Sequence, residues 1–283
     1  MPQPLTLDQW LRGARQAGLA RLDAQLLLAQ VLQRPRAWLL AHGDEALLGD
    51  QQQALDRLAA ARLQGQPLAY LTGRREFYGL MLQITPAVLD PRPDSETLVD
   101  WALDCLRGPL AAHARPRVLD LGTGSGAIAL ALAAHHAAAE VTAVERDAAA
   151  WAVAQANARR LELPLRVLHG DWFEPVDLER FELIVSNPPY LAEDDPHLPA
   201  LGAEPRQALV AGPSGLEDLA RLARGAARRL SPGGWLLLEH GALQAEAVSR
   251  LLREAGFKAV AHRQDLAGHL RCTGACMDIS APG

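Results

Sequence analysis

Apolar residues recur at helical spacing through the first quarter of the chain. Thr6 and Gln9 form a capping-box signature just ahead of Trp10, which starts a first apolar stripe. Three more stripes follow: Leu22, Leu26, Ala29 and Leu32 up to Pro35, then Trp38 and Leu39, then Leu55, Leu58 and Ala59 up to Gly65. The pattern predicts a helical domain over residues 1–75. Because this domain holds no dense cluster of catalytic residue types, we expect it to serve in recognition or docking.

The pattern changes over residues 76–93, where apolar residues no longer follow a helical period. Glu76 to Thr85 read as extended, and Pro86, Pro91 and Pro93 forbid a long helix. We therefore expect a β-hairpin and loop that connect two domains. Asp94 is then the expected N-cap of a helix over residues 96–106.

From Arg117 onward, short apolar runs alternate with stretches of helical periodicity. Such alternation is typical of a parallel sheet covered by helices on both faces. The expected strands are 117–121, 140–145, 165–169, 181–186, 234–239, 257–262 and 271–277, and the helices are 126–136, 148–160, 215–230 and 244–255. Ser214 and Glu217 form a capping box for the third of these helices. The sequence thus predicts an α/β fold with a doubly wound, Rossmann-like sheet over residues 94–283.

The overall charge narrows the range of partners. The 283 residues carry a formal net charge of -5, so we expect no direct nucleic-acid partner, which would need a basic excess. No apolar run reaches the length of a membrane span, and Met1 to Trp10 lack the features of a signal peptide. Cys105, Cys272 and Cys276 follow no metal or disulfide spacing and are interpreted as reduced thiols. We expect a cytoplasmic monomer that binds no metal or membrane.

A glycine-rich loop follows the first strand of the predicted sheet. The glycines at 122, 124 and 126 permit a tight turn and let a ligand approach the backbone closely. The next strand ends in Glu145, where a carboxylate would accept hydrogen bonds from ribose hydroxyls. Asp171 and Trp172 follow the third strand, where a carboxylate and a ring could frame an adenine. These three strand ends predict one nucleotide-binding crevice.

The glycine loop alone has two other interpretations. It could serve only strand-to-helix packing, and Gly122, Gly124 and Ala127 also fit a dinucleotide fingerprint. Asp120 opposes the second one, because a carboxylate inside the turn repels a pyrophosphate but suits a sulfonium or an ammonium. S-adenosylmethionine carries both cations and is the predicted cofactor. The expected contacts are Asp120, Gly122, Thr123, Gly124, Ser125, Gly126, Glu145, Asp171 and Trp172.

The segment Asn187-Pro188-Pro189-Tyr190 follows the fourth strand. The prolines have no N–H to donate, so their carbonyls offer only acceptors, and Asn187 adds a side-chain carbonyl. Such acceptors beside the Tyr190 ring suit an NH2 group on a planar system, whose nitrogen lone pair they would aim at the sulfonium methyl. Asn187, Pro188 and Tyr190 are the expected catalytic residues, and residues 187–190 the expected substrate site. The alternative is a Pro-Pro turn that only ends a strand.

These motifs resemble those of the release factor glutamine methyltransferase family over nearly the whole chain. Besides the glycine loop and residues 187–190, the similar segments are Pro67 to Gly73, Phe77 to Gly79, Pro91 to Asp94, Gly170 to Phe173, Glu204-Pro205 with Ala208-Leu209, and Glu239 to Gly241. The resemblance implies that Gly122 to Gly126, Glu145, Trp172 and Asn187 contact S-adenosylmethionine. It also implies that residues 187–190 hold the glutamine of a Gly-Gly-Gln loop in a class-1 peptide-chain release factor for N5-methylation, while the helical domain helps to grip that protein.

The chain departs from the family pattern at three positions. Glu145 stands where Asp is usual, Ser95 where Thr is usual, and Asp90 where an apolar residue is usual. The first departure keeps the carboxylate, and the other two concern the loop that connects the domains. Two other functions share part of the pattern: a nucleic-acid adenine N6-methyltransferase, which would bind a flipped base at residues 187–190, and an NAD-dependent oxidoreductase.

Several polar and aromatic residues outside these motifs have ordinary structural interpretations. Phe77, Tyr78 and Arg92 either line the acceptor mouth or serve core packing and a surface ion pair. His169 is expected at a strand end and His135-His136 at a solvated helix end, without a third metal ligand. Glu239-His240 is interpreted as a polar pair at a strand end, with no role as a base.

Overall fold

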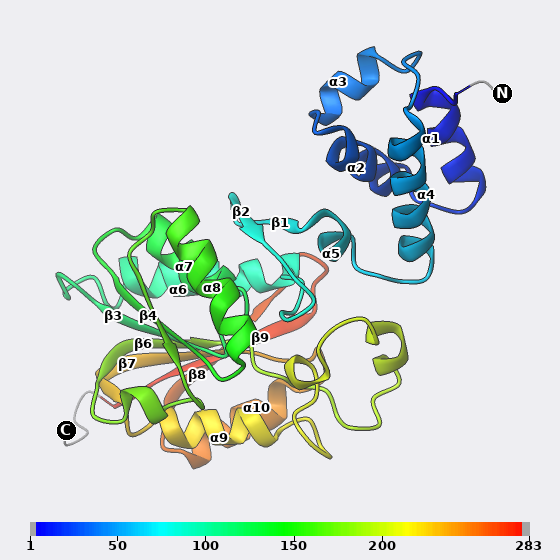
Figure 1. Ribbon diagram of the computed structural model, residues 1–283. Coiled ribbons are helices and arrows are strands. Elements are labelled where there is room, and N and C mark those ends of the chain that lie inside the picture. The colour runs from blue at the N-terminus through cyan, green and yellow to red at the C-terminus, as the bar shows by residue number, and fades with distance from the viewer. Residues whose placement is uncertain (1–3, 279–283) are drawn as a thin grey trace. The chain divides into compact units, whose positions relative to one another are not determined.

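In the computed structural model, which describes residues 4–278, the chain divides between Arg74 and Arg75 into a helical unit and an α/β unit (Figure 1). Residues 76–93 belong to the second unit. Within the described part of the chain, no helix is both long and apolar enough to cross a bilayer.

The first unit consists of helices whose apolar side chains share one core. They are α1 (Leu7–Gln16), α2 (Arg21–Leu32), α3 (Arg36–Ala41), α4 (Gly49–Leu63) and α5 (Leu68–Thr72). The capping box ahead of α1 is confirmed: the Gln9 side chain accepts from the Thr6 N–H at 2.9 Å, and the Thr6 hydroxyl accepts from the Gln9 N–H at 3.3 Å. Gly65, with φ of 92°, follows the end of α4 as predicted.

The buried face of α2 differs from the predicted stripe. Leu22 is 49% exposed, whereas Ala24, Leu27 and Leu28 are fully buried. The second half of this helix is almost continuously apolar, so several stripes of similar width can be drawn along it. Packing against the other helices determines which face of α2 is buried. The spacing of the apolar residues alone does not determine it.

The predicted hairpin is confirmed at the start of the second unit. Strands β1 (Arg74–Phe77) and β2 (Leu80–Gln83) form a two-stranded sheet. Tyr78 and Gly79 connect them with φ angles of 49° and 79°, the backbone that two-residue hairpin loops require. Asn157 accepts a hydrogen bond of 2.7 Å from the Gln83 N–H and donates one of 3.0 Å to the Gln83 carbonyl. These two bonds fasten β2 to α8 (Ala148–Arg160).

A seven-stranded sheet forms the centre of the second unit. Its strands are β3 (Arg117–Leu121), β4 (Glu140–Glu145), β5 (Leu165–His169), β6 (Phe181–Ser186), β7 (Leu230–Glu239), β8 (Lys258–Gln264) and β9 (Leu270–Cys276), in the order β5-β4-β3-β6-β7-β9-β8. The five neighbouring strands β5, β4, β3, β6 and β7 pair in parallel, as predicted. Strand β9 pairs antiparallel to both neighbours because the turn that joins it to β8 is too short for a crossover.

Helices cover both faces of this sheet, which confirms the doubly wound α/β fold. On one face lie α6 (Glu96–Arg107), α7 (Ala127–His135) and α8, and on the other lie α9 (Glu217–Ala226) and α10 (Ala245–Glu254) (Figure 1). The chain enters the sheet at β3 and extends first toward β5 and then, from β6, toward the other edge. This reversal places a crevice at the carboxyl ends of β3 and β6.

Some predicted element ends are wrong. Asp94 does not cap α6: a short 3-10 turn (Pro93–Ser95) precedes the helix, and Asp94 instead forms an ion pair with Arg271 at 3.3 Å. The helix expected over 215–230 ends at Ala226, and β7 begins at Leu230 instead of residue 234. Residues 231–233, which the prediction left outside both elements, belong to β7, and the sheet accommodates them through an irregularity in the register with β6.

Candidate active site

The loop between β3 and α7 adopts the tight turn that its glycines predict. Gly122, Gly124 and Gly126 have φ angles of 68°, 56° and 83°, in the left-handed region that favours glycine. A Cβ atom on Gly122 would lie 3.2 Å from the ring of Trp172, whereas one on Gly124 would meet nothing within 4 Å. Gly122 is therefore needed for close packing as well as for the turn, and Gly124 leaves the backbone open toward the crevice.

Asp120 lies beneath this loop and is 1% exposed. Its carboxylate accepts a hydrogen bond of 2.6 Å from the Thr123 hydroxyl. Burial raises the pKa of Asp120 to about 7, the Thr123 hydrogen bond lowers it, and the charge of Glu145 adds a smaller increase. A cation bound near Asp120 would favour its charged form, so this buried carboxyl fits a positively charged ligand.

Glu145 ends β4, and the surrounding backbone holds its carboxylate in place. One oxygen accepts a hydrogen bond from the Gly124 N–H and the other from the Asp147 N–H, both at 2.9 Å. Each carboxylate oxygen has further acceptor capacity, so the group can still bind ligand hydroxyls.

Asp171 and Trp172 follow β5 at the same edge of the sheet. The Trp172 ring is 6% exposed, and its Nε1–H has no hydrogen-bond partner among residues 4–278. Asp171 forms an ion pair with Arg221 at 2.5 Å, while its Oδ1 is buried without a partner in the same described range. A buried donor and a buried acceptor are thus available to a polar ligand.

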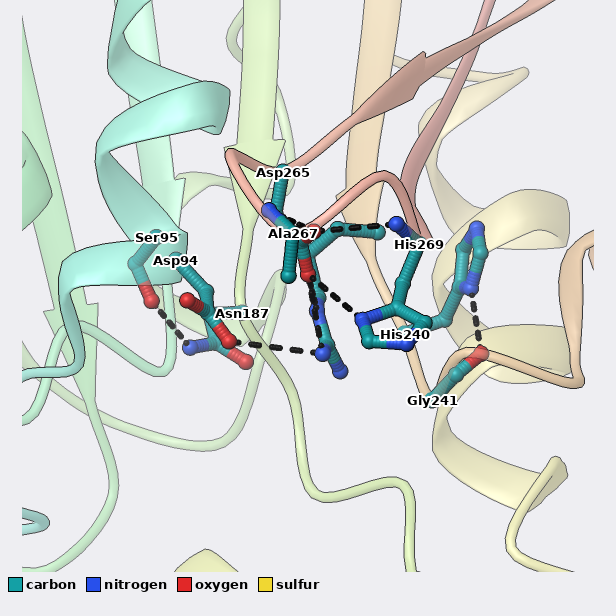
Figure 2. Close-up of polar contacts among 9 residues, drawn as sticks. Asp94, Ser95, Asn187, His240, Gly241, Asp265, Ala267 and His269 are labelled. Carbon is teal, nitrogen blue, oxygen red and sulfur yellow. Dashed lines mark hydrogen bonds and ion pairs between the residues drawn. The ribbon is translucent and has the colours of Figure 1, made fainter.

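Asn187 follows β6, which ends beside β3. The Ser186 hydroxyl donates to the Leu121 carbonyl at 2.7 Å and ties the two strand ends together. The Asn187 Nδ2 donates to the Ser95 Oγ at 3.1 Å (Figure 2). Ser95 is the residue just before α6, so Asn187 is fixed by a distant part of the chain.

One pocket brings most of the predicted cofactor residues together. It is lined by Gly122, Thr123, Gly124, Ser125, Glu145, Asp171, Trp172 and Asn187, together with Pro189 of the predicted substrate site. Two predicted cofactor residues lie outside its lining: Asp120 is buried under the loop, and Gly126 is the residue just before α7.

Pro188 and Tyr190 do not line this pocket either. Pro188 is buried, and Tyr190 is half-buried with its ring packed against the core of the sheet. Burial raises the pKa of Tyr190, and the nearby Glu239 raises it further. The backbone carbonyl of Tyr190 accepts a hydrogen bond of 2.9 Å from Gln244, which fixes the end of the segment.

The pocket also contains residues that the sequence analysis missed. Ala87, Val88 and Leu89 line it from the loop after the hairpin, and Gln207 lines it from a loop far along the chain. Residues 87–89 are apolar, lie between two prolines and belong to no predicted helix or strand. That pattern could have indicated that they cover a ligand site. Gln207 carries no such signal; its side chain donates to Asp147 at 2.8 Å.

Phe77, Tyr78 and Arg92 were expected either at the acceptor mouth or in core packing and an ion pair, and the structure places them differently. Phe77 is 1% exposed and lines the pocket, so it is both a core residue and a site residue. The Tyr78 hydroxyl donates to Asp100 at 2.5 Å. Arg92 forms ion pairs with Glu204 and with Asp90, the latter at 3.8 Å.

Histidine and cysteine residues stand apart from this chemistry. The His169 Nε2 lies 2.9 Å from the Arg146 carbonyl at the end of β5. Cys105, Cys272 and Cys276 are unpaired. Over residues 4–278, no group of three or more His, Cys, Asp or Glu side chains could hold a metal ion.

The fold and the pocket define an S-adenosylmethionine-dependent methyltransferase: a glycine loop, a buried carboxyl and an acidic strand end surround one crevice at the switch point of the sheet. Residues 94–203 match the family model of the Methyltransferase small domain, and residues 7–73 match that of the PrmC N-terminal domain. The chain belongs to the release factor glutamine methyltransferase family, because curated members align with more than nine-tenths of its length at 43–52% identity.

Three relatives illustrate this similarity. The release factor glutamine methyltransferase of Bordetella pertussis is 52% identical over 260 residues, which cover 91% of this chain and 95% of the relative. That of Salmonella typhimurium is 44% identical over 276 residues, with 95% and 98% covered. That of Escherichia coli is 43% identical over 273 residues, with 94% and 97% covered.

Solved structures share the fold. The Thermus thermophilus 16S rRNA N2 G1207 methyltransferase, solved with AdoMet and guanosine, is 27% identical with a TM-score of 0.53 and covers 72% of this chain and 49% of its own. The hMettl16 catalytic domain, solved in complex with the MAT2A 3'UTR hairpin 6, is 20% identical with a TM-score of 0.58, and 79% of this chain and 82% of that chain are covered. The second likeness concerns the fold alone.

Proposed function

We propose that this protein transfers a methyl group from S-adenosylmethionine to the side-chain nitrogen of the glutamine in the Gly-Gly-Gln loop of a class-1 peptide-chain release factor. The observation that carries the proposal is the position of Asn187, which lines the same pocket as the glycine loop. Similarity to curated release factor glutamine methyltransferases over more than nine-tenths of the chain supports the choice of substrate.

The residues around the pocket suit the parts of this cofactor. Glu145 has free acceptor capacity for the ribose hydroxyls, and the buried Trp172 ring with the unpartnered Asp171 Oδ1 suits an adenine with its amino group. Asp120 would stabilise positive charge from beneath the loop. The cofactor supplies an electrophilic methyl group on a sulfonium.

The acceptor residues have to hold a poor nucleophile in the right direction. An amide nitrogen shares its lone pair with its carbonyl, so positioning contributes a large part of the rate. The Asn187 Oδ1 would accept one N–H group, and the backbone carbonyl of Pro188, whose side chain is buried behind the pocket, would accept the other. Pro189 lines the pocket, and the Tyr190 ring supports the segment from the core. As the N–C bond forms, the S–C bond breaks; the amide nitrogen then releases its extra proton to water, so no general base is needed beforehand.

We assign the remaining parts of the chain accordingly. Residues 1–75 would bind the release factor as a recognition domain, residues 76–93 would connect, and residues 94–283 would carry the transfer. The helical unit has its own core, centred on Leu27, Leu28 and Leu55, so it offers a rigid surface for docking. We also propose that the protein acts as a monomer and binds no nucleic acid directly.

The test uses labelled S-adenosylmethionine and a purified release factor, followed by peptide mass mapping. We expect one added methyl group on the glutamine of the Gly-Gly-Gln loop and none when that glutamine is replaced by alanine. Asn187→Ala is expected to lower kcat by about 100-fold or more, because it removes an acceptor that orients the nitrogen. Methyl incorporation into DNA or RNA, with the release factor unlabelled, would refute the proposal in favour of adenine methylation.

A further inference from the structure

Glu239 is a buried carboxyl group next to the acceptor segment. It is the last residue of β7 and is 1% exposed. Strands β6 and β7 pair in parallel with Ser186 opposite Leu238, so the residues that follow, Asn187 and Glu239, lie at neighbouring strand ends. A carboxyl group buried this deeply requires polar neighbours.

Ser95 and Asn187 provide those neighbours. Burial raises the pKa of Glu239 to about 7, while hydrogen bonding by Ser95 and Asn187 lowers it. The charged groups around it act in both directions: Arg271 of β9 lowers the pKa and Asp94 raises it. Arg271 forms ion pairs with both Asp94 and Asp265, so its positive charge is shared between them.

The titratable neighbours on the other sides are weak acids held neutral. Tyr190 and Cys272 both have their pKa raised, by burial first and by the charge of Glu239 second. Neither can supply Glu239 with a positive partner. Among residues 4–278 the Glu239 Oε2 is buried without a hydrogen-bond partner. The carboxylate form of Glu239 is therefore favoured only by the side chains of Ser95 and Asn187 and by the nearby Arg271.

These contacts determine which way the Asn187 amide faces. Its two ends differ only in that the nitrogen donates and the oxygen accepts, so its orientation follows from its partners. The Nδ2 donates to the Ser95 Oγ at 3.1 Å, which leaves the Ser95 hydroxyl proton for Glu239. A carboxylate accepts and cannot donate, so Glu239 favours the NH2 end of Asn187 on its own side and repels the oxygen. The Oδ1 is thereby directed away from Glu239.

We infer that Glu239 is a positioning residue, which acts with Ser95 to hold the Asn187 amide with its Oδ1 toward the substrate amide. The inference rests on the proposed function, since it assigns Asn187 the role of hydrogen-bond acceptor for the glutamine NH2. It extends that function to a residue on β7 that does not line the pocket.

Glu239→Gln tests the inference with almost no change in volume. A glutamine can present its own NH2 toward Asn187 and allow the amide to turn, so kcat should fall roughly 10- to 100-fold. The Kd for S-adenosylmethionine should stay as in the wild type, because the glycine loop and Glu145 are untouched. Glu182→Gln is the matched control: this buried glutamate at the opposite end of β6 is bonded to Arg117 and Ser231, so its loss should leave kcat unchanged.

A charge exchange separates positioning from a merely structural role. Asn187→Asp places a carboxylate beside Glu239 and should lower kcat by at least about 100-fold, through repulsion between the two carboxylates and loss of the donor. Adding Glu239→Gln to this variant introduces a side-chain NH2 at position 239. That NH2 can donate to one oxygen of the new carboxylate at position 187, which leaves the other oxygen facing the pocket. We expect the double variant to be at least about tenfold more active than Asn187→Asp alone. Loss of packing at Glu239 predicts no such rescue.

The outcomes distinguish this inference from the proposed function. If the wild type methylates no release factor, the proposed function fails. If the wild type is active and Glu239→Gln keeps the wild-type kcat, or the double variant shows no rescue, the role of Glu239 is refuted. If Glu239→Gln does not fold, Ser95→Ala replaces it as the test, because it removes the hydroxyl that contacts both Asn187 and Glu239. We expect a lower kcat and an unchanged Kd for S-adenosylmethionine. An unchanged kcat in Ser95→Ala would overturn the inference.

Discussion

The buried carboxyl of Asp120 should make the ligand-free protein less stable as the pH rises. Its pKa is raised from 3.8 to about 7 by burial, so the folded state binds a proton more tightly than the unfolded state does. The associated stability is fully present below the unfolded pKa and is lost as the pH rises through about 7. Relative to a neutral side chain, the destabilisation caused by Asp120 grows from about 2 kcal/mol at pH 5 to about 4 kcal/mol at pH 8.

Asp120→Asn removes this ionisation and keeps an oxygen that can accept from the Thr123 hydroxyl. The variant should therefore gain stability over the wild type, and the gain should be about 2–3 kcal/mol larger at pH 8 than at pH 5. Urea unfolding of both proteins without cofactor, at the two pH values, measures this difference. Asp44→Asn serves as the control because it neutralises an exposed carboxylate.

Asp120→Asn should also bind S-adenosylmethionine more weakly than the wild type. If the Asp120 carboxylate stabilises a cation, then S-adenosylmethionine should raise the unfolding midpoint of the wild type at pH 8 much more than that of Asp120→Asn. A variant that is no more stable than the wild type at pH 8, or equally more stable at both pH values, would refute the reasoning about this buried charge.

Two further substitutions test the scaffold of the pocket. Asn157→Ala removes hydrogen bonds to Gln83 and a bond of 2.9 Å to the Ser125 carbonyl, so urea unfolding should show a loss of about 2–3 kcal/mol together with weaker cofactor binding. Normal stability in that variant would contradict the role given to Asn157. Gly122→Ala combines a φ of 68° with a Cβ 3.2 Å from the Trp172 ring, so it should cost about 1–2 kcal/mol and raise the Kd for S-adenosylmethionine, as calorimetry would measure. Gly13→Ala is its control, since a Cβ there meets nothing within 4 Å.

Local physics in the sequence determined much of this protein. The capping box at Thr6, the hairpin at Tyr78 and Gly79, and the turn of the glycine loop all depend on residues within a few positions of one another. The alternation of apolar runs with helical stretches predicted the strands from β3 to β6 at their observed bounds. Since parallel strands end at one edge of a sheet, it also predicted that the glycine loop, Glu145 and Asn187 would meet.

Tertiary structure decided what depends on packing between distant segments. The sequence favoured Asp94 as a helix cap, yet an available partner, Arg271 of β9, holds it in an ion pair. The apolar run of α2 did not reveal its buried face, because packing selects among stripes of similar width. Ser95, Asn187 and Glu239 come from a helix start and two different strand ends, and no local spacing relates them. Only the pairing of β6 with β7, and the packing of α6 beside them, sets the direction of the one amide on which the proposed chemistry depends.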